Sequence, residues 1–435
     1  MLWKKSKLVT MSNVDKSSTS QEYYTIAEIS NILGVSKETL RRWDASGKLV
    51  PIRHPINKYR VYHKSQLEIF EQANLLMNSK WDDELDVKPK RNYRLIELFA
   101  GAGGLAVGME KAGFESVLLN EFNKDACQTL RINRPKWNVV EGDIAGVDFK
   151  KYKGKIDILT GGFPCQAFSY AGKKLGFEDI RGTLFYQFAR AVREINPAIF
   201  LGENVRGLLS HDSGKTLQTI KNVISELGYT LVEPKVLKAI YFQVPQKRER
   251  LILIGVRNDL ADFVSKYRWP SPSKRVLTIK DALKKGTLYP TNVSKSAGQK
   301  YPTRKKEILD LVPPGGYWRD LPLDIQKEFM KKSFFLGGGK TGMARRLSWE
   351  EPSLTLTCAP AQKQTERCHP DETRPLTIRE YARIQTFPDE WKFAGSLSSQ
   401  YKQIGNAVPV NLAHAVGRSL IRLFNEMEGV GKKTH

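Results

Sequence analysis

The chain has 435 residues, 40% of them hydrophobic and 27% charged, which is enough apolar sequence for one large domain and at least one smaller domain. The net charge of +24 indicates a polyanionic partner, and no basic helix with a broad apolar face points to a membrane surface, so nucleic acid is favoured. No apolar run is long enough to span a membrane and no signal peptide is evident, so we expect a cytoplasmic protein without membrane contact.

The first 21 residues have no apolar periodicity and are predicted to be a disordered tail, followed by a small domain over residues 22–77. Thr25 and Glu28 have the spacing of a capping box at the start of a helix. Gly34 then turns the chain, and Ser36 can cap a second helix. Two short helices joined by such a turn are typical of a helix-turn-helix, whose second helix enters the major groove.

The second helix of this unit is basic, and a basic two-stranded wing and a closing helix are predicted after it. The residues expected to contact DNA from this helix are Lys37, Arg41 and Arg42. The whole stretch resembles the MerR and excisionase type of winged helix-turn-helix. The alternative is a helical hairpin for protein contacts, in which the arginines are merely solvated.

Residues 78–92 are polar, lack periodicity and are predicted to be a linker. After them, apolar runs alternate with helical patterns, which predicts a doubly wound α/β sheet with ligand sites at the carboxyl ends of its strands. The expected strands cover residues 95–99, 116–119, 156–163, 198–205 and 251–256, and the expected helices cover 183–195, 216–228, 376–385 and 407–424. Between about 270 and 375 the alternation is lost.

A glycine-rich turn follows the first of these strands. Gly101 and Gly103, with Ala106, fit the dinucleotide-binding fingerprint, and Glu121 falls about twenty residues later, where a carboxylate can hold the two ribose hydroxyls. Asp143 suits an adenine amino group. This pattern indicates an adenosine cofactor, and NAD and S-adenosylmethionine satisfy it equally.

A second turn, "GGFPCQAFS", places Cys165 at the carboxyl edge of the same sheet. Cysteine is a common core residue, so the turn alone does not identify a nucleophile. Glu203 and Asn204 end a later strand at the same edge, and Arg248 and Arg250 precede another strand. A thiol, a carboxyl group and arginines beside an adenosyl cofactor indicate covalent catalysis.

The order of the motifs "FAGAGG", "NEF", "GDI", "GGFPCQAFS", "GTLF", "GENV", "QKRER", "RPLTIREYARIQTFPD" and "QIGNAVP" resembles that of the DNA cytosine-5 methyltransferases over nearly all of residues 93–425. The resemblance implies a Rossmann-like fold that uses S-adenosylmethionine rather than NAD. It also implies a catalytic domain at 93–271, a target-recognition domain at 272–373 and a return to the catalytic domain at 374–427.

The same resemblance implies roles for individual residues. Cys165 would attack the base, Glu203 would contact its ring nitrogen and amino group, and Arg248 would steady the catalytic loop. The implied catalytic set is Cys165, Gln166, Glu203, Asn204, Arg248 and Arg250. The implied cofactor set is Phe99, Ala100, Gly101, Ala102, Gly103, Gly104, Leu105, Glu121, Phe122, Asp143, Ile144, Pro164, Leu184 and Asn406. Outside the N-terminal domain, the expected DNA contacts are Ser169 of the catalytic domain and Thr355 and Leu356 of the target-recognition domain.

These features predict an enzyme that methylates cytosine C5 in a specific sequence of double-stranded DNA, as the modification half of a restriction–modification system. The resemblance implies that it acts as a monomer. Its cognate endonuclease would be a genetic partner rather than a subunit, and the N-terminal domain would regulate the enzyme's own promoter. The alternatives are a transcription regulator with a vestigial methylase body and an RNA cytosine-5 methyltransferase. An NAD oxidoreductase fits only the glycine loop. Cys358, Cys368 and His369 do not complete a metal site, so no metal is expected.

Overall fold

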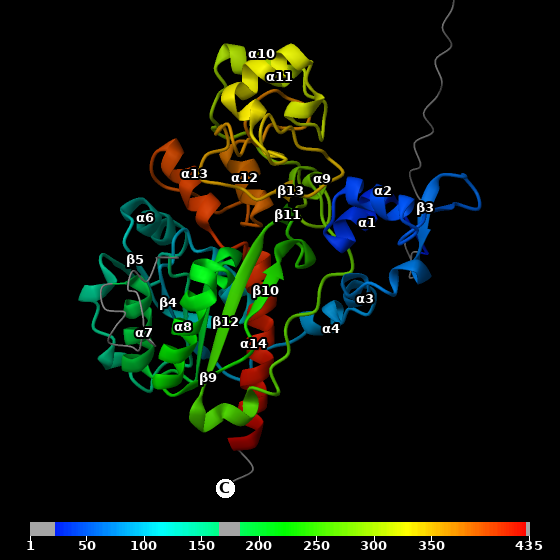
Figure 1. Ribbon diagram of the computed structural model, residues 1–435. Helices are drawn as coiled ribbons and strands as arrows, with labels where there is room; N and C mark the ends of the chain where they lie inside the picture. Colours follow the sequence, from blue (N-terminus) through cyan, green and yellow to red (C-terminus); the bar gives the residue numbers. More distant parts are fainter. Residues whose placement is uncertain (1–21, 165–182, 432–435) are drawn as a thin grey trace, which may run out of the picture. The chain divides into compact units, whose positions relative to one another are not determined.

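The computed structural model describes residues 22–164 and 183–431 of the chain (Figure 1). The chain divides into two compact units between Asn74 and Leu75, and each is described by itself below. The predicted tail lies outside the described residues.

The N-terminal unit begins with the predicted helix pair. Glu28 N donates to Thr25 Oγ1 at 3.3 Å, and Thr25 N donates to Glu28 Oε2 at 2.7 Å, so the capping box is confirmed. Gly34 adopts a left-handed conformation with φ 66°, and Ser36 Oγ caps the second helix by accepting from Thr39 N at 3.0 Å. The elements in chain order are β1 (Tyr23–Tyr24), α1 (Ile26–Leu33), α2 (Lys37–Ala45), β2 (Ile52–Arg53), β3 (Arg60–His63) and α3 (Glu71–Met77).

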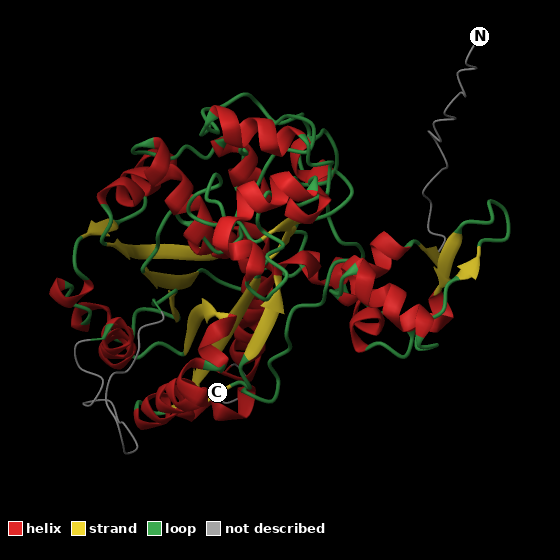
Figure 2. Cartoon of the chain, turned by 45° about the horizontal axis from the view of Figure 1, so that its top comes forward, coloured by secondary structure: helices red, strands yellow, loops and turns green. Residues whose placement is uncertain are grey.

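Strand β1, before the helix pair, and strands β2 and β3, after it, form a small antiparallel sheet of order β1-β3-β2. Strands β2 and β3 are the predicted wing (Figure 2). The strand β1 was not predicted, because two tyrosines carry no alternation that would indicate a strand. The core of the unit is made by buried side chains from the two helices, strand β3 and the connecting segments, namely Ile29, Leu33, Leu40, Leu49, Val61, Tyr62 and Leu67.

The prediction of a linker at 78–92 is wrong, because part of this stretch forms a helix that packs within the second unit. Helix α4 (Trp81–Leu85) buries Trp81 to 4% exposure. Glu84 is also buried, and its carboxylate accepts hydrogen bonds from Ser271 N at 3.1 Å and from Arg422 at 3.4 Å. A single tryptophan among charged residues gave no periodic signal, so this short helix could not be recognised from the sequence.

The second unit is built on an eight-stranded sheet of order β10-β12-β8-β7-β4-β5-β6, with β9 paired to β12. The strands from β6 to β8 are parallel, whereas β12 is antiparallel to β8, β9 and β10. Their bounds are β4 (Tyr93–Leu98), β5 (Phe114–Glu121), β6 (Val139–Glu141), β7 (Ile158–Gly161), β8 (Ile199–Val205), β9 (Tyr229–Leu231), β10 (Lys235–Lys238) and β12 (Glu249–Arg257).

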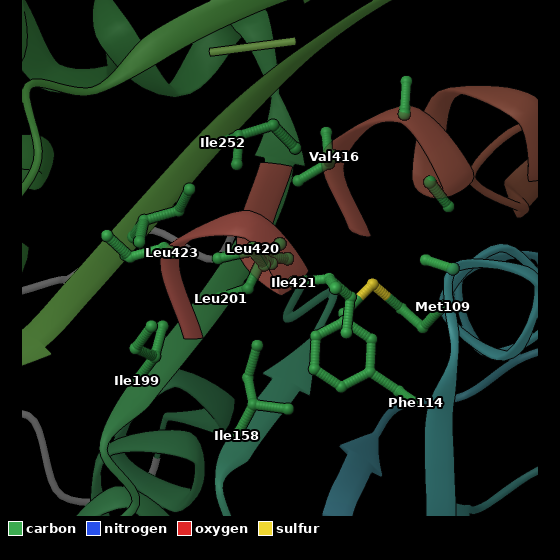
Figure 3. Packing of buried hydrophobic residues seen from close by; sticks show 14 of the residues in the cluster. Met109, Phe114, Ile158, Ile199, Leu201, Ile252, Val416, Leu420, Ile421 and Leu423 are labelled. Carbon is green, nitrogen blue, oxygen red and sulfur yellow. The ribbon is translucent and has the colours of Figure 1, made fainter. Parts of the chain in front are cut away.

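Helices cover both faces of this sheet, which explains why its strands are apolar on both sides. Leu95 packs in the core shared with α5 and α14, whereas the next residue, Ile96, packs in the core shared with α7 and α8. Figure 3 shows the first of these cores, where Met109 of α5 and Leu420 of α14 lie among strand residues. The helices are α5 (Gly104–Ala112), α6 (Lys124–Asn133), α7 (Leu184–Ile195), α8 (Lys215–Glu226) and α14 (Val410–Gly431).

The segment between β12 and α14 contributes two further cores. One packs against the glycine-loop side of the sheet around Trp391, and the other is a separate cluster around Trp318. A parallel pair of short strands, β11 with β13, joins the segment to the start of β12. The elements are β11 (Gln246–Lys247), α9 (Ile279–Leu283), α10 (Thr303–Asp310), α11 (Leu323–Met330), β13 (Ser353–Leu354), α12 (Ile378–Ile384) and α13 (Leu397–Asn406).

Candidate active site

The glycine turn after β4 has the backbone shape that the sequence predicts. Phe99, Gly101 and Gly103 all have positive φ, at 57°, 54° and 84°. A Cβ added at Gly103 would lie 2.7 Å from a methyl group of Leu130, so that glycine is required by packing. A Cβ at Gly101 would meet nothing within 4 Å, so this part of the turn borders open space where a ligand can approach the backbone.

Glu121, at the end of β5, is held against this turn. Its Oε2 accepts a hydrogen bond from Gly101 N and its Oε1 accepts one from Asn123 N, both at 2.7 Å. These bonds fix the orientation of the carboxylate and leave acceptor capacity on both oxygens. Phe122 follows with an exposed ring. An oriented carboxylate and an exposed aromatic ring therefore follow one another at the end of β5.

Asp143 lies at the same edge, two residues beyond the end of β6. The register of the parallel pair places Glu121 of β5 opposite Glu141 of β6. Asp143 Oδ1 accepts from Ala145 N at 2.8 Å, which holds the turn, and Ile144 is buried beneath it. The predicted cofactor residues on β4, β5 and β6 thus converge on one edge of the sheet.

Glu203 and Asn204 end β8 beside the turn that follows β7. A Cβ added at Gly162 would lie 2.8 Å from Glu203 Oε2, so the carboxylate lies directly over the backbone of this turn. Asn204 Nδ2 donates to the Phe163 carbonyl at 2.9 Å. Both side chains are buried, and together they fix the turn that leads to position 165.

Arg250 forms an ion pair with Glu203, with 2.5 Å between Nε and Oε1. In the β8–β12 register Ile252 is opposite Glu203, so Arg250 lies diagonally across from it on the same face of the sheet. Each side chain is only 11% exposed. A buried carboxylate paired in this way is held in one position, and removal of either partner would leave an uncompensated charge.

The nucleophile candidate Cys165 lies outside the described residues, as do Gln166 and Ser169. The chain is described up to Pro164, which is exposed, and again from Thr183, just before Leu184 begins α7.

Arg248, by contrast, forms no hydrogen bond with a carboxylate among the described residues. It is 2% exposed and donates to the carbonyls of Leu356, at 3.3 Å, and Gly405, at 3.0 Å. Burial, together with the positive charge of Arg250, lowers the pKa of Arg248 to about 9. Arg248 therefore joins the backbone just after β13 to the C-terminal end of α13.

Leu356, which the resemblance implies is a DNA contact, has a buried side chain in this structure. Leu356 is 1% exposed and packs in the core around Trp391, while its backbone N–H donates to Gln246 Oε1 at 2.9 Å. Thr355 Oγ1 donates to the Lys247 carbonyl at 2.5 Å. This Thr-Leu pair therefore anchors the segment around β13 to β11. The resemblance from which the pair was taken carries no information about these contacts.

Glu97, a buried carboxyl group in the middle of β4, is a site residue that the sequence did not predict. Burial raises the pKa of Glu97 to about 8, although hydrogen bonds from the Ala106 backbone and the Thr160 hydroxyl oppose the shift. Because Ala106 is in the first turns of α5, Glu97 connects the strand to the helix on either side of the glycine loop. A charged residue within an otherwise apolar strand was the available signal.

Asn406, another predicted cofactor residue, is exposed at the end of α13 and accepts a hydrogen bond from Cys358 Sγ at 3.1 Å. Cys368 is instead buried in the core around Trp318. Within residues 22–164 and 183–431, no group of three or more His, Cys, Asp or Glu side chains is arranged to hold a metal ion. No helix in the same ranges is long and apolar enough to cross a membrane.

In the N-terminal unit, α2 presents its predicted basic residues to solvent. Arg41 and Arg42 are exposed, and Arg41 forms an ion pair with Glu38 at 3.1 Å. Lys37 lies in the first turn of the same helix. This is the surface that a helix-turn-helix uses to read a major groove.

Comparison with known proteins identifies both parts of the chain. Residues 93–422 match the model of the C-5 cytosine-specific DNA methylases. The chain belongs to this family. It is a DNA cytosine-5 methyltransferase, and residues 24–82 match the model of the MerR HTH family regulatory proteins, so both resemblances seen in the sequence are confirmed.

Several type II methyltransferases are similar to this methyltransferase over nearly their whole length. M.Eco47II of Escherichia coli is 68% identical, and the match covers 94% of this chain and 97% of the relative. M.PspPI of Psychrobacter sp. (strain TA137) is 62% identical, with 93% and 97% covered.

Among solved structures, a DNA modification methyltransferase encoded within an E. coli prophage matches with a TM-score of 0.58 and 24% identity, covering 77% of this chain and all of the other. Spodoptera frugiperda DNMT2 matches with a TM-score of 0.52 and 16% identity, over 77% of this chain and all of the other. Both confirm the α/β methyltransferase fold.

Proposed function

We propose that this methyltransferase transfers a methyl group from S-adenosylmethionine to C5 of a cytosine within a specific DNA sequence, and so protects host DNA in a restriction–modification system. The observation that carries the proposal is the Glu203–Arg250 pair, held over the turn that leads to Cys165, at the sheet edge that also bears the glycine loop. The enzyme acts as a cytoplasmic monomer, and its cognate endonuclease is a genetic partner.

The residues at the edge of β4, β5 and β6 fit S-adenosylmethionine. The open backbone at Gly101 would receive the methionine part, the Glu121 carboxylate would accept hydrogen bonds from the ribose hydroxyls, and the exposed ring of Phe122 would stack on adenine. The Asp143 turn reads the edge of the base. When bound, this cofactor supplies an electrophilic methyl group.

The protein activates the cytosine for that methyl group. The Cys165 thiolate adds to C6 while Glu203 gives a proton or a hydrogen bond to N3, so the ring becomes an enamine with electron density on C5. After C5 has gained the methyl group, loss of the C5 proton re-forms the C5–C6 double bond and expels the thiolate. Because C6 is inaccessible inside a duplex, the base must first leave the stack, at a cost of a few kcal/mol. Phosphate contacts of this basic protein offset that cost.

The cofactor assignment predicts that Glu121→Gln raises the Kd of S-adenosylhomocysteine about 10- to 100-fold, because two charge-assisted hydrogen bonds become neutral. Isothermal titration calorimetry of the full chain measures this Kd. Glu141→Gln, on the neighbouring strand β6, is the matched control and should stay within about twofold of wild type. Equal affinity for Glu121→Gln and wild type would contradict the assignment.

Bisulfite sequencing of DNA from cells that express the enzyme tests the substrate. We expect protected cytosines at every copy of one short sequence and at no other place. That DNA should also resist an endonuclease that cleaves the same sequence. Protected cytosines without a common sequence would rule out the restriction–modification role.

We further propose that the N-terminal unit binds the enzyme's own promoter and regulates it. The support is a MerR-type unit, with an exposed basic α2, ahead of a catalytic domain. In a gel-shift assay the full chain should bind DNA from upstream of its gene at least about tenfold more tightly than unrelated DNA, and Arg42→Ala should remove this preference without changing kcat. Lys48→Ala, at an exposed position after α2, is the control. If wild type shows no preference for upstream DNA, the regulatory role is wrong.

A further inference from the structure

Two neighbouring apolar side chains are exposed where the short 3₁₀ helix after α11 (Lys331–Phe335) passes into a loop. Phe335 is 81% exposed and Leu336 is 65% exposed, and Phe335 is the most exposed large hydrophobic side chain among the described residues of the second unit. We call these two residues the apolar pair. An exposed apolar cluster of this kind is unfavourable in water unless a partner covers it.

Aromatic packing anchors the segment that bears the apolar pair to the core around Trp318. Phe334 packs edge-to-face against Trp318, with 6.1 Å between ring centroids, and Phe335 packs edge-to-face against Phe334 at 5.3 Å. Trp318 is buried in its own core, and its indole N–H donates to the Gly339 carbonyl at 3.3 Å. The apolar pair is therefore carried on a structured base.

Lys340 holds the backbone on both sides of Phe335. Its ammonium group donates to the carbonyls of Ser333 and Leu336, and Leu336 N donates to Ser333 O at 3.3 Å. These bonds hold the backbone of the loop in a tight turn. The exposure of the pair is thus a consequence of the loop's own bonding.

The surroundings of the pair are positively charged. Residues 331–349 contain no Asp or Glu, and Lys331 and Lys332 are exposed directly before the apolar pair. Beyond the pair, a Cβ added at Gly337 or Gly338 would meet nothing within 4 Å, so a flat partner can approach the backbone closely. This surface combines exposed apolar side chains, neighbouring lysines and an accessible glycine backbone. It is therefore complementary to a polyanion that also has apolar faces.

Duplex DNA has this chemistry, because its phosphates flank stacked bases whose faces and thymine methyl groups are apolar. We propose that Phe335 and Leu336 contact the bases of the recognition duplex as an apolar wedge, while Lys331 and Lys332 bind the flanking phosphates. Apolar wedges of this kind separate neighbouring base pairs. This assignment rests on the proposed methylation of duplex DNA and adds to it the residues that contact the bases.

The test compares the double variant Phe335→Ala/Leu336→Ala with wild type in the full chain with S-adenosylhomocysteine. The probe is a 30-base-pair duplex that carries the sequence which wild type methylates, and a scrambled duplex is the comparison. We expect the variant to lose about tenfold or more in affinity for the first duplex and little for the second. The slope of log Kd against log salt should not change, because no phosphate contact is removed.

Two control variants separate the contributions. Lys331→Ala/Lys332→Ala should weaken both duplexes and reduce the salt slope. Ile132→Ala, which removes an exposed apolar side chain on α6, should change neither affinity. Unchanged affinity and specificity of the Phe335→Ala/Leu336→Ala variant would overturn the proposal, including the case in which the pair binds another protein instead. If wild type itself methylates no duplex, the proposed function has failed, which is a different result.

Discussion

Replacement of Cys165 by alanine is expected to abolish methyl transfer, with kcat lowered by about 10⁴-fold or more. Without a thiolate no group adds to C6, so C5 remains a poor nucleophile toward the methyl donor. Binding should persist, with the Kd of the specific duplex within about threefold of wild type, because the phosphate contacts remain. Transfer of a tritiated methyl group to the duplex measures the rate, and fluorescence anisotropy measures the Kd.

Cys368→Ala provides the thiol control. This cysteine is buried in the core around Trp318, and its loss should leave kcat within about threefold of wild type. A Cys165→Ala enzyme that methylates as fast as wild type would refute the covalent mechanism. An unaltered wild-type chain without activity, together with promoter binding, would instead support a regulator with a vestigial methylase body.

Glu203→Gln is expected to lower kcat by about 10²- to 10⁴-fold, because an amide cannot supply the proton that N3 needs as the thiolate adds. The amide also leaves Arg250 without its buried partner, so some loss of stability should accompany the loss of activity. Single-turnover methylation at saturating duplex and cofactor isolates the chemical step from binding.

Glu249→Gln is the matched control for this variant. Glu249 is on the same strand, next to Arg250, but it pairs with Arg206 at 2.9 Å and is more exposed. Its substitution should change kcat less than about twofold. If both variants lose activity equally, the effect of Glu203→Gln is structural; if neither loses activity, Glu203 has no part in the proton transfer.

Local signals were sufficient for the elements that bear the site. Strand β4, the glycine turn and the carboxylate of Glu121 are encoded within about 30 consecutive residues, where apolar runs, glycines and an acidic residue each have a fixed relation to the backbone. The capping box of α1 is similarly local. These parts of the fold were predicted from spacing alone.

Other features depend on contacts between distant residues. Arg248 and Arg250 are two residues apart, yet one is bound by the carbonyls of Leu356 and Gly405 and the other by the Glu203 carboxylate. Only the pairing of β8 with β12 decides which arginine meets Glu203. The burial of Leu356 and the docking of α4 likewise depend on surfaces that are distant in the sequence, which explains why both were missed.

The most direct test of the mechanism is a duplex in which the target cytosine is replaced by 5-fluorocytosine. Since fluorine cannot leave C5 as a proton does, the bond between the enzyme and C6 cannot be released. We predict a complex that survives denaturation, requires S-adenosylmethionine and carries its added mass on Cys165. Methylation of the normal duplex without any such complex, or a complex formed through another residue, would contradict the account.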